Sequence, residues 1–142
     1  MGEKTARRRV GAWAALVAAG AGLALAGCAA APDTRPVQDE LDRWVDKVPL
    51  SQVQRAEPKT VTCPSSDGQR QAVAEASGRT AEPFDERALR ELLADMGYGT
   101  NSLIIEPPTD GYILSARRPD GGSLTLRARG DEFSVSILGP CS

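Results

Sequence analysis

Apolar residues recur at helical spacing in two segments of the chain. In residues 37–48 the spacing predicts an amphipathic helix with one apolar stripe. In residues 85–97 it predicts a second helix, with Asp85 as the N-cap and Gly97 at the C-terminal end. The first stripe consists of Val37, Leu41, Trp44, Val45 and Val48, and the second of Leu89, Leu92, Leu93 and Met96.

The first predicted helix carries carboxylates opposite its apolar stripe. Asp39, Asp42 and Asp46 have no glycine-hinged loop beside them, so a solvated face is a better interpretation than a calcium site. Its apolar stripe leaves three possibilities open: packing on the domain, on a membrane or on a partner.

Four segments near the C-terminus alternate between apolar and polar residues. Residues 102–106, 111–118, 123–129 and 133–139 are divided by turn signals rich in glycine, proline and aspartate. Tyr112 and Leu114, for example, alternate with Ile113 and Ser115. This pattern predicts an α+β fold in which a small antiparallel meander has one or two helices on one face and water on the other.

The middle of the chain is harder to assign. Residues 59–62 are β-like and end at Cys63-Pro64, while residues 64–84 carry the weakest pattern. Residues 69–76 fit either a strand after the Asp67-Gly68 turn or a loose helix, and we favour the strand.

The N-terminus combines a basic segment with a long uncharged one. Lys4 and the three arginines at positions 7–9 precede residues 10–27, which carry no charge. This is the layout of a signal peptide. The arginines also admit a twin-arginine export signal, although a plain basic region explains them equally.

The uncharged run closes with Leu25-Ala26-Gly27-Cys28, a tetrapeptide that resembles the lipobox of bacterial lipoproteins. The resemblance implies cleavage before Cys28 and lipidation of its thiol, which would tether the mature protein to a membrane. The alternative is an ordinary secretory signal with a chance cysteine. We therefore expect a signal peptide at 1–27, a tether at 28–36, a helix and linker at 37–57, and a domain at 58–142.

The charge of the mature chain argues against nucleic acid as a partner. Without residues 1–27 the chain has 13 basic and 18 acidic residues, a net charge near −5. Lysine is scarce and alanine and glycine are plentiful, which suggests a GC-rich actinobacterial genome. The overall layout is similar to that of small surface lipoproteins of actinobacteria, which implies an envelope location and a disulfide-closed α+β domain.

Two cysteines remain after the lipobox. Cys63 and Cys141 form an even pair on the oxidising side of a membrane, so we predict a disulfide between the end of the first strand and the end of the last. Metal ligation by these thiols would need further histidine or cysteine ligands, which the mature sequence lacks.

The sequence contains no histidine, so histidine-activated serine or cysteine nucleophiles and the usual zinc site are excluded. It also has no phosphate loop or dinucleotide motif. We expect no catalytic residues, no metal and no cofactor.

Arginines gather on the polar face of the predicted meander. Arg117, Arg127 and Arg129 share this face and Arg118 is close by, so Arg117 and Arg127 are expected to reach one anionic ligand. The alternative is that they only keep the exposed face soluble.

These features predict a membrane-anchored, extracytoplasmic and monomeric lipoprotein. Its domain is expected to be a non-enzymatic binding module for an envelope protein, with the polar face of the sheet or the Trp44 helix as the contact surface. The alternative is a carrier or sensor of a small anionic or lipidic ligand.

Overall fold

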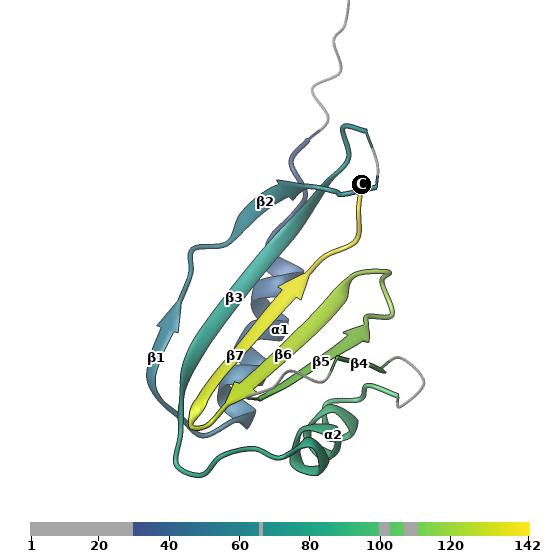
Figure 1. Ribbon diagram of the computed structural model, residues 1–142. Coiled ribbons are helices and arrows are strands. Elements are labelled where there is room, and N and C mark those ends of the chain that lie inside the picture. The colour runs from purple at the N-terminus through teal and green to yellow at the C-terminus, as the bar shows by residue number, and fades with distance from the viewer. Residues whose placement is uncertain (1–29, 66, 100–102, 107–110) are drawn as a thin grey trace, which may run out of the picture.

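The computed structural model describes residues 30–65, 67–99, 103–106 and 111–142, and the predicted signal peptide and Cys28 lie outside them. The described residues form two helices and seven strands (Figure 1). In chain order the elements are α1 (Arg35–Lys47), β1 (Leu50–Arg55), β2 (Lys59–Thr62), β3 (Arg70–Thr80), α2 (Glu86–Asp95), β4 (Leu103–Glu106), β5 (Tyr112–Arg117), β6 (Ser123–Arg129) and β7 (Glu132–Leu138).

The strands form one antiparallel sheet in the order β1-β3-β7-β6-β5-β4. The long strand β3 pairs with β7 along one side and with both β2 and β1 along the other. The predicted C-terminal meander is confirmed, and the strand predicted at 69–76 is present as part of β3.

Both helices contribute to one core on one face of the sheet, which confirms the α+β fold class. Helix α1 packs against β3 and β7 and buries Val37, Leu41 and Trp44. Beneath it β3 presents small side chains, those of Ala72, Ala74 and Ala76, which leave room for the helix. Of the three possibilities that the sequence left open for this helix, the structure shows packing on the domain.

Helix α2 follows its sequence signals. A side-chain oxygen of Asp85 accepts a hydrogen bond of 2.7 Å from the Ala88 N–H, as an N-cap does. Gly97 has a φ of 87°, which ends the helix in a conformation that favours glycine. Leu89 and Leu93 are buried in the same core as α1.

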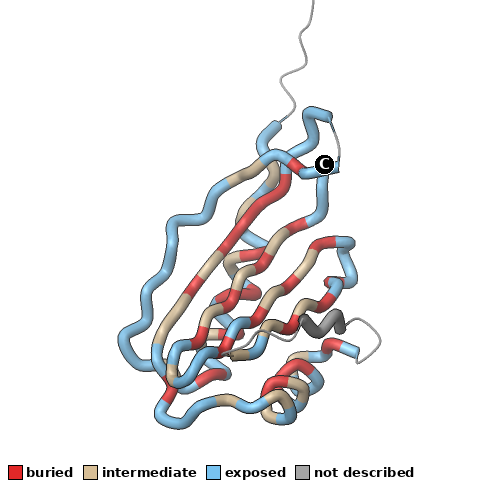
Figure 2. The backbone as a smooth tube through the Cα atoms, in the orientation of Figure 1, coloured by how far each residue is buried: buried red, intermediate tan, exposed pale blue. Residues whose placement is uncertain are grey.

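Burial alternates along the C-terminal strands as the sequence predicts (Figure 2), except that Tyr112, at the start of β5, is exposed. One face of β5, β6 and β7 is buried under the helices and the other is half-buried or exposed. The buried positions are Leu114, Ala116, Leu124, Leu126, Ala128, Phe133, Val135 and Ile137.

Strand β1 lies in the segment that the sequence analysis treats as a linker. Five of its six residues are exposed, so no apolar alternation marks it. It forms an edge of the sheet, and its pairing with β3 is irregular between Ser51 and Gln54, where Gln52 has a φ of 53°.

The predicted disulfide joins Cys63 to Cys141, which are 78 positions apart. Because β1 was not expected, Cys63 follows the second strand rather than the first. The C-terminus is also bonded to β3, since the backbones of Arg70 and Ser142 exchange two hydrogen bonds of 3.0 Å. The two ends of the domain therefore meet at one pole of the sheet (Figure 1).

Candidate functional site

The face of the sheet opposite the helices is open and polar. Hydroxyl side chains occupy much of it, and most are half-buried rather than fully exposed. They come from four neighbouring strands and are Ser77 on β3, Ser115 on β5, Thr125 on β6, and Ser134 and Ser136 on β7.

Two shallow hollows lie on this open face. One has a volume of about 650 Å³ and the other of about 560 Å³. Four residues line both hollows, namely Gln54, Ser77, Ser134 and Arg127. These four residues therefore mark the middle of the concave surface.

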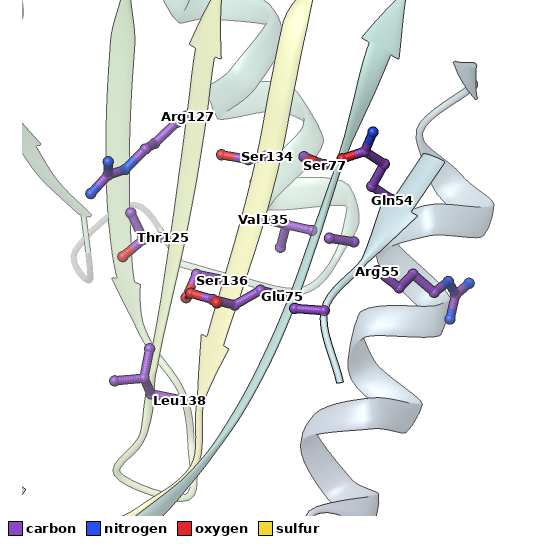
Figure 3. A pocket seen from close by; sticks show the side chains of 12 residues that line it. Gln54, Arg55, Glu75, Ser77, Thr125, Arg127, Ser134, Val135, Ser136 and Leu138 are labelled. Carbon is purple, nitrogen blue, oxygen red and sulfur yellow. The ribbon is translucent and has the colours of Figure 1, made fainter. Parts of the chain in front are cut away.

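The same four residues form a row across the sheet, which we call the central row. Arg127 pairs with Ser134 between β6 and β7, and Ser134 pairs with Ser77 between β7 and β3. Ser77 pairs in turn with Gln54 between β3 and β1. Figure 3 shows the four side chains following one another across these strands. With about 4.8 Å between strands, the row spans about 15 Å.

On one side of the central row, the polar side chains of the neighbouring row bond to one another. The hydroxyls of Ser115 and Thr125 lie 3.3 Å apart, and that of Ser136 donates to Oε1 of Glu75 at 3.2 Å. Lys59 also pairs with Glu75, with 3.7 Å between Nζ and Oε2.

The row on the other side is held by ion pairs. Arg79 pairs with Asp131 at 2.6 Å and with Glu132 at 4.0 Å. Arg129 stands opposite Glu132 in the register of β6 and β7.

The central row differs from both. Within the described part of the chain, no hydrogen bond or ion pair engages the side chains of Gln54, Ser77, Ser134 or Arg127. Arg127 and Gln54 are exposed, and the two serines are half-buried. The row thus presents a cation, two hydroxyls and an amide that are free to bind another molecule.

The predicted arginine stripe is divided on the open face. Arg127 and Arg129 both line the second hollow, whereas Arg117 lines neither hollow. Arg117 pairs with Ser123, whereas Arg127 pairs with Ile113, four positions away along β5. This offset separates the two arginine backbones by about 13 Å along the strands. Arg127 alone of the predicted stripe belongs to the central row.

Arg118 is buried rather than part of a surface stripe. Its Nη2 lies 3.2 Å from Oε2 of Glu40 on α1 and 3.1 Å from Oδ2 of Asp120. The side chains of Arg118 and Glu40 are 7% and 9% exposed. The hydroxyl of Tyr98 donates to Oε1 of the same carboxylate.

This buried cluster of Glu40, Tyr98 and Arg118 shifts the pKa of Tyr98. Burial, and then the hydrogen bond and charge of Glu40, raise the pKa of the Tyr98 hydroxyl well above its usual range. Glu40 was not predicted to be buried or to belong to a site, although its position in the sequence offers a signal. Glu40 lies three residues after Val37 and four before Trp44, so it occupies the apolar stripe of its helix.

Two other features are absent from the described residues. Among them no group of three or more aspartate, glutamate, cysteine or histidine residues could hold a metal ion. Neither described helix is long and apolar enough to cross a membrane.

The chain is similar to a solved structure, that of a DUF4853 family protein from Actinomyces odontolyticus. The two share 11% sequence identity with a TM-score of 0.47, over 76% of this chain and 60% of the other. The match therefore spans less than two thirds of the neighbour's length. No family model and no curated protein sequence matches the chain.

Proposed function

We propose that this protein is a membrane-anchored extracytoplasmic lipoprotein whose domain is a non-enzymatic binding module. The open face of the sheet is its binding surface, and its partner is a component of the cell envelope. The central row carries this proposal, because its polar groups have no partner among the described residues, whereas the rows on either side of it make hydrogen bonds or ion pairs.

The anchor would orient this surface. From Cys28 to Arg35, where α1 begins, the chain can reach at most about 25 Å. The chain enters α1 at the pole where the C-terminus lies (Figure 1). A lipid on Cys28 would therefore keep that pole near the membrane and leave the open face accessible from the side.

Substitution of the lipobox cysteine tests the anchor. We expect Cys28→Ala to move the protein from the membrane fraction to the soluble extracytoplasmic fraction. We also expect an inhibitor of the lipoprotein signal peptidase to accumulate the longer precursor of the unsubstituted chain. Membrane association and processing that are both unchanged would contradict the proposed anchor.

Site-specific cross-linking in intact cells tests the binding surface. A photoreactive amino acid at position 134 would lie in the central row, and one at position 87 would lie on the exposed side of α2. We expect a recurrent cross-linked product from position 134 and none from position 87. Equal labelling at both positions, or none at 134, would refute the choice of surface.

The alternative function, a carrier or sensor of a small anionic ligand, is favoured by one observation. Arg127 lines both hollows and has no ion-pair partner among the described residues. The same surface would serve either function, and the chemistry of the ligand distinguishes them.

A further inference from the structure

We infer that the central row recognises a small hydroxylated ligand that carries a phosphate or carboxylate group. This inference rests on the proposed binding surface and specifies what binds there. The anionic group would contact Arg127, and the hydroxyl groups of the ligand would contact the two serines and Gln54.

The charges on the open face support the inference that the ligand carries an anionic group. Glu75 is paired with Lys59, and Arg79 with Asp131 and Glu132. Arg127 stands between these pairs, at the junction of the two hollows. A guanidinium binds carboxylate or phosphate oxygens through two parallel N–H groups, which makes such a ligand its natural partner.

The uncharged side chains of the central row support the inference that the ligand carries hydroxyl groups. The hydroxyls of Ser134 and Ser77 each donate and accept, and the Gln54 amide does both as well. They continue from Arg127 in register, so a ligand that places its anion on Arg127 reaches them next.

The size and character of these side chains favour a small polar ligand over a protein. None of the residues in the central row is aromatic. Protein interfaces concentrate their binding energy in aromatic side chains and arginine, and are depleted in serine. Short serine side chains also leave the concave space above the row open to a ligand.

Arg117 provides a matched control on the same face. Like Arg127 it is exposed on a strand and has no ion-pair partner among the described residues. In the strand register, however, it lies opposite Ser123 in another part of the sheet, and it lines neither hollow. Binding that depends only on surface charge should respond equally to the loss of either arginine. Binding in the central row should respond to Arg127 alone.

The experiment uses saturation-transfer NMR on the full chain in a nonionic detergent. The probes are glycerol 3-phosphate and glucuronate, and the neutral controls are glycerol and glucose. We expect at least one of the two anions to bind saturably and its neutral counterpart to bind about tenfold more weakly or worse. Glycerol 3-phosphate alone would indicate a phosphate ligand, and glucuronate alone a carboxylate ligand.

Three variants locate the binding. Arg127→Gln should weaken binding of the anion about tenfold, because it removes a charged hydrogen bond but keeps most of the side chain. Arg117→Gln should leave the affinity within about twofold. Ser77→Ala combined with Ser134→Ala should weaken binding about threefold or more.

Three outcomes would overturn the inference: no saturable binding of either anion, equal loss in the two arginine variants, or glucose and glycerol binding as well as the anions. Unchanged thermal unfolding of each variant excludes misfolding as the cause. If cross-linking at position 134 persists while neither anion binds, the binding surface stands and the anionic ligand is rejected. If position 134 gives no specific product while an anion binds through Arg127, the envelope partner is rejected and the small ligand stands.

Discussion

The carboxylate of Glu40 is expected to be the most important charge for the stability of the domain. It accepts a hydrogen bond from Tyr98 and forms an ion pair with Arg118, and the side chains of Glu40 and Arg118 are both more than nine-tenths buried. Glu40→Gln keeps the shape and one acceptor oxygen but removes the negative charge. Arg118 would then remain buried with only Asp120, which is 37% exposed, as a counter-ion.

The size of the effect follows from this geometry. Removal of one partner from a buried ion pair destabilises a protein by about 3–5 kcal/mol. Because glutamine still accepts from Tyr98 and Asp120 remains, we expect the lower end, about 3 kcal/mol. That would be a large share of the total stability of a small domain and would lower its melting temperature by about 10 °C.

Two features of Arg118 make this loss hard to relieve. Its Nε and Nη1 atoms are buried and make no hydrogen bond within the described residues. Its charge therefore depends on the Nη2 contacts with the two carboxylates. Asp120→Asn, which removes the more exposed of these, should cost only about 1 kcal/mol or less.

Urea unfolding followed by far-UV circular dichroism measures these effects, with the disulfide kept oxidised. The double variant Glu40→Gln with Arg118→Met should regain part of the loss, because no buried charge then lacks its partner. A free energy of unfolding for Glu40→Gln within about 1 kcal/mol of the unsubstituted chain would refute the reasoning. So would equal effects of Glu40→Gln and Asp120→Asn.

Three other predictions concern stability. Replacing Cys63 and Cys141 with serine should lower the free energy of unfolding by about 4.5 kcal/mol in the chain-entropy model for a 78-residue loop, and urea titration would contradict this if the midpoint stayed unchanged. The raised pKa of Tyr98 should make the free energy of unfolding fall as the pH rises above about 10, because only the unfolded chain then loses the Tyr98 proton. Tyr98→Phe should reduce this fall, as measured by urea midpoints at pH 8 and 11. Gly122→Ala should lower the free energy of unfolding by about 1–3 kcal/mol, and with it the melting temperature, because the new Cβ would meet the Leu138 carbonyl oxygen at 2.1 Å. An unchanged melting curve would count against that crowding.

The parts of the fold that the sequence predicts are those with a local signal. Strands β5, β6 and β7 have one apolar and one polar face, and burial follows that alternation. Helix α2 has its N-cap at Asp85 and its glycine end at Gly97. In each case a few neighbouring residues contain all the information that the prediction needs.

The parts that the sequence does not predict depend on distant neighbours. Strand β1 is exposed on nearly every residue, so only its pairing with β3 makes it a strand. Glu40 could be placed on the buried stripe of α1, but its partners Arg118 and Tyr98 come from two other parts of the chain. Arg118 was expected only to lie close to the arginine-rich face, whereas it follows β5 directly and its side chain is buried in the domain.

In the central row, too, one strand pairing can be predicted from local sequence and another cannot. Alternation assigns Arg127 and Ser134 to one face, but whether they stand side by side depends on register. The turn between β6 and β7 contains only Gly130 and Asp131, so Arg129 pairs with Glu132 and, two positions back, Arg127 pairs with Ser134. No such turn joins β3 to β7, where the intervening chain contains α2, β4, β5 and β6, so the pairing of Ser77 with Ser134 is a result of tertiary packing. Half of the central row can thus be derived from one short turn, and the other half exists only because α1 and the core hold β3 in place beside β7.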